Sequence, residues 1–161
     1  HVSTSDDVVG VETCAAIKNI FSMAVGASQG LCDAKQSKEK NYLNTAAALM
    51  QESIYEMITF VEKLKGKKET VIGLAGIGDL YVSADGGRNS KMGEYLGQGM
   101  TFKEAKKTKM PNDTVEGADL ALEIGRKVKD DFDSKTLPLM TSMINTICDQ
   151  KPLKVDWNNF K

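Results

Sequence analysis

Histidine is almost absent from this sequence of 161 residues, and the single one is His1. We exclude His1 from the chemistry because it stands at the end of the chain. Without another histidine, Ser/His/Asp and Cys/His nucleophile arrangements and histidine-rich metal sites are excluded together. Any catalysis must therefore use lysine, carboxylates, tyrosine or a cofactor, and we expect no metal site.

Cysteine and an excess of one charge are also lacking. The three cysteines are too few and too scattered for a disulfide framework or a zinc site, which indicates a reduced, cytoplasmic protein. Lysine and arginine total 21 against 22 acidic residues, so nothing in the charge favours a nucleic-acid partner. No run of about 18 apolar residues is free of charge, and the start has no basic-then-apolar leader. We therefore expect no membrane span.

Proline and strand-like alternation are rare as well. All three prolines fall in the last third of the chain. Apolar residues recur instead at steps of three and four, as on one face of a helix. The sequence predicts one all-α, multi-helix domain over residues 8–161, with residues 1–7 as the remnant of a connection to another domain. The expected helices lie near 8–31, 43–64 and 90–96, on a short segment after 101, and from about 113 and 138.

Helix starts are marked by capping residues. Asp7 and its polar neighbours precede the first helix and are candidates for its N-cap. Thr101 and Glu104 have the spacing of a capping box, and Asp113 and Glu116 repeat that spacing further along. These pairs predict helices that begin near 101 and 113.

The first predicted helix is apolar nearly all round, but it contains Lys18 and Asn19. A helix of this composition is typical of a buried, central position. An unpaired buried ammonium costs several kcal/mol, so Lys18 requires a carboxylate partner, a cavity or a ligand. The alternative is a lysine that extends along a half-buried helix to reach solvent.

Residues 73–89 are rich in glycine and cannot form one plain helix. Their glycines lack the order of a dinucleotide or P-loop motif, so they indicate tight turns and close packing. They leave Asp79 as a carboxylate at the end of an apolar run. Arg88 and Asn89 follow a glycine pair at the start of the next helix, where a phosphate would suit both the helix terminus and the guanidinium. The alternative is a turn with a solvated arginine.

Taken in order, these motifs resemble a known family. They are Asp7-Val-Val-Gly-Val-Glu12, Ala16-Ile-Lys18-Asn19, Gly76-Ile-Gly-Asp79-Leu, Arg88-Asn89 and Val115-Glu116-Gly117. The order and spacing are similar to those of the C-terminal domain of NAD(P)-dependent glycerol-3-phosphate dehydrogenase.

The resemblance implies an oxidoreductase that interconverts sn-glycerol 3-phosphate and dihydroxyacetone phosphate. In the family, an N-terminal Rossmann domain binds the nucleotide and an all-helical domain binds the substrate. This chain resembles the substrate half alone, so the fragment is expected to be inactive without its Rossmann domain. NAD or NADP would be held mainly by that other domain, which leaves the choice between them open. A homodimer stays open too.

The resemblance also implies roles for individual residues. The catalytic residues are Lys18, which matches the family's catalytic lysine, and Asp79. Both would also contact the substrate, together with further polar residues. Substrate contacts are expected from Lys18, Asn19, Asp79, Arg88 and Asn89, and cofactor contacts from Arg88, Thr114 and Glu116.

Two other readings stay open. The chain could be the helical substrate domain of a different Rossmann-type dehydrogenase, for a hydroxy acid or a sugar acid. It could also be a non-catalytic helical interaction module, which would need an exposed apolar patch and a solvated Lys18. Contact between Lys18 and Asp79 in a cavity would count against the interaction module.

Overall fold

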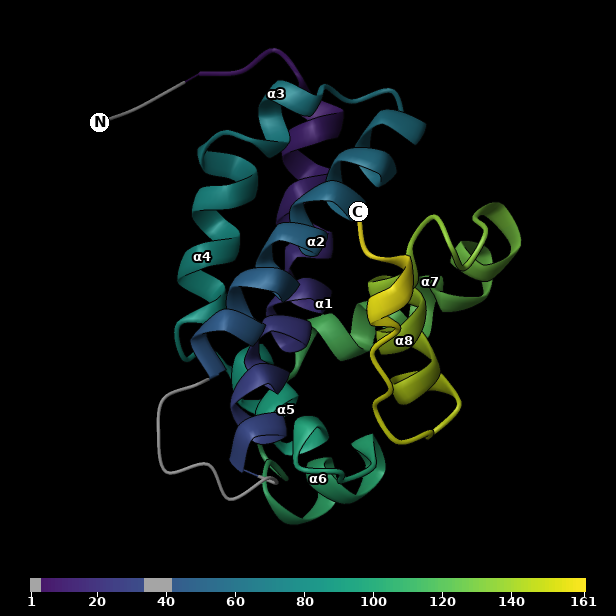
Figure 1. Ribbon diagram of the computed structural model, residues 1–161. Helices are drawn as coiled ribbons and strands as arrows, with labels where there is room; N and C mark the ends of the chain where they lie inside the picture. The colour runs from purple at the N-terminus through teal and green to yellow at the C-terminus, as the bar shows by residue number, and fades with distance from the viewer. Residues whose placement is uncertain (1–3, 34–41) are drawn as a thin grey trace.

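The computed structural model describes residues 4–33 and 42–161, and this part of the chain contains helices and no strand. The all-α prediction is therefore confirmed (Figure 1). Of the predicted connecting segment 1–7, residues 1–3 lie outside the described residues. The elements are α1 (Val8–Asp33), α2 (Tyr42–Lys63), α3 (Lys68–Val71), the π-helical turn η1 (Leu74–Gly78), α4 (Asp79–Ala84), α5 (Arg88–Gly97), α6 (Phe102–Thr108), α7 (Glu116–Asp131), α8 (Pro138–Cys148) and the 3₁₀ turn η2 (Trp157–Asn159).

The first helix, α1, is the centre of the domain and contacts α2, α4, α5, α7 and α8. Its middle is buried on every side, as its composition predicts. By length and apolar composition alone, Val8–Cys32 would also be long enough to cross a bilayer. Half of its most apolar window is buried inside the protein, so its hydrophobic residues serve as core. The buried core residues of α1 are Cys14, Ile17, Ile20, Phe21, Met23, Ala24, Val25 and Ala27.

Helix α5 packs against α1 at backbone distance. A Cβ on Gly93 would lie 1.9 Å from the carbonyl oxygen of Met23, and one on Gly26 would lie 2.2 Å from that of Ser90. Only glycine fits at both positions, because any side chain would collide with backbone. This close packing holds the start of α5 beside the middle of α1, and it places Arg88 and Asn89 near Lys18 and Asn19.

Two of the predicted helix starts are confirmed and one is wrong. Asp7 accepts a hydrogen bond from the Gly10 backbone N–H at 2.9 Å, as expected of the residue that caps α1. Thr101 caps α6 by accepting from the Glu104 N–H at 3.3 Å. Helix α7, however, begins at Glu116 after Val115, without a side-chain cap, so Asp113 is not its N-cap.

Helix α8 is attached to α2 through a buried carboxylate. Glu56 is 1% exposed and accepts hydrogen bonds from the backbone N–H groups of Leu139 and Met140, at 2.5 and 2.8 Å. These are among the first N–H groups of α8, which have no partner within their own helix. Burial raises the pKa of Glu56 to about 8, although the two N–H donors act in the opposite direction. Glu56 thus caps a neighbouring helix.

The end of the chain lies along the same region of α2 (Figure 1). One carboxylate oxygen of Glu52 accepts from the Lys161 backbone N–H at 2.9 Å. Its other oxygen, Oε1, is buried without a hydrogen-bond partner. Burial raises the pKa of Glu52 as well. Helices α7 and α8 and the final segment therefore form one side of the molecule, while α3, η1 and α4 form the other (Figure 1).

Candidate functional site

Lys18 and Asp79 form an ion pair across 61 positions of sequence. Lys18 extends from the middle of α1, and Asp79 is the first residue of α4. The side chain of Lys18 is 17% exposed and that of Asp79 is 39% exposed. The carboxylate partner that the buried position of Lys18 requires is therefore Asp79, and the pair remains open to solvent on the carboxylate side.

The turn η1 determines where Asp79 lies. A Cβ on Gly76 would lie 2.0 Å from the carbonyl oxygen of Val71, so the turn is packed directly onto the end of α3. The Gly78 N–H donates to the Gly73 carbonyl at 3.3 Å, one residue further than in an α-helix. Single π-turns of this kind are frequent at functional sites. The glycine-rich stretch thus brings a carboxylate to α1 by a turn that no other residue type would allow at 76.

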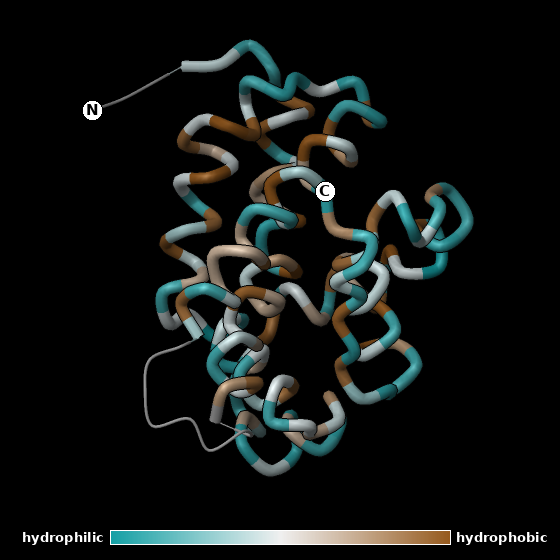
Figure 2. The backbone as a smooth tube through the Cα atoms, in the orientation of Figure 1, coloured by the Kyte–Doolittle hydropathy of each residue, from teal (hydrophilic) through white to brown (hydrophobic). Residues whose placement is uncertain are grey.

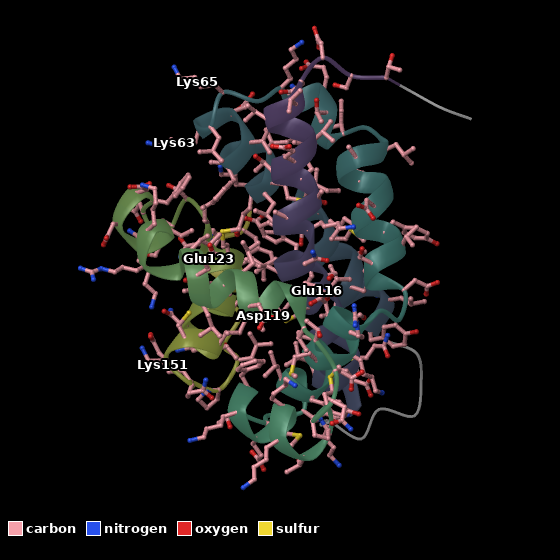
Figure 3. The ribbon with its side chains drawn as sticks, turned by 180° about the vertical axis from the view of Figure 1, so that it is seen from behind. Lys63, Lys65, Glu116, Asp119, Glu123 and Lys151 are labelled. Atoms are coloured by element: carbon pink, nitrogen blue, oxygen red, sulfur yellow. The ribbon has the colours of Figure 1, made fainter. Side chains whose placement is uncertain are left out.

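Arg88 and Glu116 form a second ion pair, at the start of α5 and of α7. Figure 3 shows Glu116 where α7 meets α1, with Asp119 and Glu123 further along α7. The side chains of Arg88 and Glu116 are 53% and 43% exposed. Ion pairs as exposed as this contribute little to stability, so Arg88 can exchange Glu116 for another anion at small cost.

Asn89 connects the two ion pairs. Its side chain accepts from the Gly117 backbone N–H at 2.9 Å and donates to Asn19 at 3.1 Å. Asn19 directly follows Lys18 on α1, and Gly117 directly follows Glu116 on α7. Six of the predicted site residues therefore form two groups, Lys18 with Asp79, and Asn19 with Arg88, Asn89 and Glu116. The two groups adjoin at Lys18 and Asn19, which are consecutive residues of α1.

Thr114 is the predicted site residue that is not brought into this network. It is exposed in the segment that leads into α7. None of the hydrogen bonds found within the described part of the chain joins Thr114 to the other six residues. Its expected contact with a cofactor stays a prediction.

A cleft of about 1600 Å³ extends from Asp79 over the first turns of α1, α3 and η1. Several of its lining residues are apolar and exposed: Leu74 is 73% exposed, Val82 is 70% and Val8 is 63%. Figure 2 shows hydrophobic residues along η1 and α4, at the edge of the molecule. The sequence predicts that the face on which the missing domain docks exposes apolar side chains, but it did not indicate that Leu74, Val82 and Val8 form such a surface.

Residues 7–156 match the family model described as NAD-dependent glycerol-3-phosphate dehydrogenase C-terminus. This match covers nearly the whole chain. The chain belongs to the glycerol-3-phosphate dehydrogenase family.

Individual glycerol-3-phosphate dehydrogenases agree with this assignment. The chain is similar to the glycerol-3-phosphate dehydrogenase [NAD(P)+] of Agathobacter rectalis, with 34% identity over 157 residues that cover 96% of this chain and 43% of that protein. The corresponding protein of Coxiella burnetii is 40% identical over 110 residues, which cover 67% of this chain and 31% of that protein. The chain thus spans less than half the length of these relatives.

A crystal structure of glycerol-3-phosphate dehydrogenase from Coxiella burnetii has a similar fold. The TM-score is 0.75 at 31% sequence identity, and the match covers 92% of this chain and 42% of that one. Plasmodium falciparum glycerol-3-phosphate dehydrogenase matches with a TM-score of 0.74 at 22% identity, which shows the shared fold alone. Both matches cover less than half of the solved chain.

The described residues could bind one phosphate group of a dinucleotide, but they do not form a complete dinucleotide site. Arg88 offers a half-exposed guanidinium at the start of a helix of ten residues. A phosphate group would be stabilised there by both the helix terminus and the guanidinium. The described helices, however, contain no strand that could precede a glycine-rich nucleotide loop. The start of α5 can therefore hold one phosphate group, and the described residues form no loop of the dinucleotide-binding type.

Proposed function

We propose that this chain is the substrate-binding and catalytic half of an oxidoreductase that interconverts sn-glycerol 3-phosphate and dihydroxyacetone phosphate with NAD or NADP. Family membership supports the class of reaction. The observation that carries the proposal is the Lys18–Asp79 pair, which joins a lysine of the core helix to a carboxylate on the wall of a cleft. A cation held in this way is suited to an oxygen that gains negative charge during the reaction.

Lys18 would donate a proton to the reacting oxygen, or accept one from it. The nicotinamide, when bound, supplies a hydride to the carbonyl carbon or removes it from the alcohol carbon. During reduction, the Lys18 ammonium donates a proton to the former carbonyl oxygen, and the resulting amine recovers a proton from solvent. During oxidation, the amine accepts the proton of the hydroxyl group. Asp79 keeps the ammonium in place.

Arg88 would bind the phosphate group of the substrate. Its guanidinium has the planar geometry that suits two phosphate oxygens at once. Its present partner Glu116 is only half-buried, so exchange for a phosphate dianion is favourable in charge and small in cost. Asn19, next to Lys18, would donate to a substrate hydroxyl or carbonyl oxygen. The family resemblance adds Asn89 to this group, and it adds Arg88, Thr114 and Glu116 to the contacts of the cofactor.

The cleft would be the surface on which the nucleotide-binding domain docks. The exposed side chains of Leu74, Val82 and Val8 provide the apolar contact that domain interfaces require. Asp79 lies in the same cleft, so docking there would bring the dinucleotide to the Lys18 pair. In this proposal residues 1–7 connect the two domains, and the whole protein works in the cytoplasm. Without the second domain, this surface would favour a homodimer.

The other readings differ in what they require of the site. A hydroxy-acid or sugar-acid dehydrogenase would use Arg88 for a carboxylate in place of a phosphate. An interaction module requires a solvated Lys18, whereas the side chain of Lys18 is 17% exposed and paired. The phosphorylated three-carbon substrate is favoured because Arg88 lies at a helix start, where phosphate is bound most readily.

The proposal is tested with the full-length protein, by following oxidation of NADH and of NADPH. We expect turnover with dihydroxyacetone phosphate, and at least about 10³-fold lower kcat/KM with unphosphorylated dihydroxyacetone, since a site built to bind a phosphate rejects the analogue that lacks it. Residues 1–161 alone should fold but show no turnover. Equal activity toward a small keto acid, or no activity with the phosphorylated ketone, would overturn the assignment.

A further inference from the structure

One buried carboxylate joins the start of α1 to the start of α3. The Oδ1 atom of Asp7 accepts a hydrogen bond from the Gly10 backbone N–H at 2.9 Å, within α1. Its Oδ2 atom accepts from the Lys67 backbone N–H at 2.8 Å and from the Thr70 hydroxyl at 2.6 Å. These donors lower the pKa of Asp7, the Thr70 hydroxyl most of all, so the carboxyl group is ionised at neutral pH. Asp7 therefore connects two helices that are far apart in the sequence.

Two glycines leave the space in which this carboxylate lies. A Cβ on Gly10 would lie 1.9 Å from Oδ2 of Asp7, so a side chain there would displace the carboxylate. A Cβ on Gly66 would lie 2.9 Å from the Cα of Gly10, so the segment before α3 runs directly against the backbone of α1. The contact between α1 and α3 thus depends on close backbone packing around one charged group.

Helix α3 leads without a loop to the residue that pairs with Lys18. It ends at the fully buried Val71, against which η1 packs through Gly76. Asp79 then follows η1 as the first residue of α4. Figure 1 shows α3 beside the first turns of α1. Lys18 lies in the middle of α1, so the two members of the ion pair belong to the two parts of the chain that Asp7 joins.

We infer that Asp7 is a positioning residue for the proposed reaction, because it holds α3 against α1 and so fixes the position of Asp79 relative to Lys18. The inference rests on the proposed function and adds to it a residue that contacts neither substrate nor cofactor. Lys18 itself depends little on Asp7, since α5 and α7 hold the middle of α1. Loss of the tie should move Asp79, and the effect should be moderate because α3 also contacts α2.

The test uses two matched pairs of variants of the full-length protein. Thr70→Val removes the hydroxyl donor and keeps the size of the side chain, whereas Thr70→Ser keeps the hydroxyl. Asp7→Asn replaces one accepting oxygen by an NH₂ group, which can only donate. Its control is Asp6→Asn, which removes the neighbouring carboxylate together with its exposed ion pair to the Lys67 ammonium at 2.7 Å.

Backbone NMR signals show whether the segment that carries Asp79 has moved. We expect the N–H signals of Gly78 and Asp79 to shift clearly in Thr70→Val and in Asp7→Asn. The same signals should stay in place in Thr70→Ser and in Asp6→Asn. Unchanged signals in both Thr70→Val and Asp7→Asn would overturn the inference. This measurement requires no turnover, so it decides the role of Asp7 even if the proposed function fails.

The kinetic measurement is a double-mutant cycle of Thr70→Val and Asp79→Asn. We expect Thr70→Val alone to lower kcat by about 10-fold, as a small displacement of a distant group can do, and Thr70→Ser to restore it. In the Asp79→Asn background, the further loss should be below about threefold, because residues that act through one another are not additive. An unchanged kcat in Thr70→Val, or an equal loss in both backgrounds, would overturn the inference. A wild type without turnover would contradict the proposed function instead.

Discussion

Two charged positions of this domain differ in what surrounds them. Glu56 is 1% exposed, and both of its oxygens accept backbone N–H groups at the start of α8. Lys18 and Asp79 are 17% and 39% exposed in their side chains, and they form an ion pair with each other. Asp79 also lies on the wall of the cleft. Both oxygens of Glu56 are hydrogen-bonded within the protein, whereas the Lys18–Asp79 pair is partly exposed and can still contact a ligand.

This difference separates an ionisable group with a structural role from a pair that is available for chemistry. A buried carboxylate is tolerated when backbone donors satisfy it, and its removal leaves those donors unpaired. A partly exposed pair contributes little to stability, so its presence in an apolar helix needs another explanation. Substitutions at Glu56 should lower the free energy of unfolding more than kcat. Substitutions at Lys18 or Asp79 should lower kcat more than the free energy of unfolding.

The largest effect on folding is expected from Glu56→Ala. This change leaves the N–H groups of Leu139 and Met140 buried without acceptors, at about 1–3 kcal/mol each. The free energy of unfolding, measured in urea, should therefore fall by about 2–6 kcal/mol. Glu62→Ala, at an exposed position of the same helix, should be nearly neutral. Equal stability of the two variants would contradict the structural role of Glu56.

The corresponding effect on chemistry is expected from Asp79→Asn in the full-length protein. The amide keeps the shape of the side chain but holds the Lys18 ammonium less firmly. A loss of about 10²-fold in kcat is expected, as for a catalytic group that is out of place. The free energy of unfolding should fall less than in Glu56→Ala, because the pair is partly exposed and water can reach the ammonium that loses its partner. A large loss of stability with unchanged kcat would make this pair structural as well.

The free energy of unfolding should depend on pH because the pKa of Glu56 differs between the folded and the unfolded protein. Its pKa is about 8 in the folded protein, against an ordinary value of 4.5, so the unfolded chain loses this proton first as the pH rises. Stability is then fully present below about pH 4.5 and decreases up to about pH 8, by at most about 1.4 kcal/mol per pH unit. Urea unfolding between pH 5 and pH 8 should show this decrease, and Glu56→Gln should reduce it. An unchanged slope in Glu56→Gln would assign the decrease to other groups.

The smallest effect is expected from Asp7, and it has the opposite sign. The Thr70 hydroxyl, with the N–H groups of Lys67 and Gly10, lowers the pKa of this carboxyl below its ordinary 3.8. Its contribution is therefore present above that value and is lost as the pH falls toward the lowered pKa. Asp7→Asn should flatten the acid side of the stability profile and lower the whole neutral side without changing its slope, because the contribution of the carboxylate is lost there at every pH. A change confined to the neutral side would contradict this assignment.

Much of the fold could be predicted because it depends on local pattern. The spacing of apolar residues on the second helix predicts a core face that includes Met57 and Val61, and both are fully buried. The same pattern fails at its ends, since Leu43 and Leu64 are 59% and 46% exposed. Periodicity shows which face of a helix is apolar, but it does not show how far the neighbouring helices extend along that face.

The wrong prediction of a helix start near 113 shows a second limit of prediction from local sequence. Asp113 and Glu116 have the spacing of a capping box, yet the helix begins at Glu116 and no side chain caps it. The carboxylate of Glu116 is used instead by Arg88 and Asn89, 28 and 27 positions earlier in the sequence. A local motif can be outweighed by partners that only the packing of α5 on α1 brings within reach. For the same reason, the bond between Asn19 and Asn89 could not be predicted.

The most direct test of the account is Lys18→Met in the full-length protein, with kcat and the free energy of unfolding measured on the same preparation. Methionine keeps the length and the apolar part of the side chain but lacks the ammonium. General acid catalysis contributes about 10²–10⁴-fold and charge stabilisation at the same oxygen about 10²–10³-fold, and because one group supplies both, we expect a loss near 10⁴-fold in kcat. Stability should stay close to that of Lys103→Met, a substitution at an exposed lysine. Turnover like that of the wild type in a folded Lys18→Met protein would contradict the central claim that Lys18 handles the proton of the reacting oxygen.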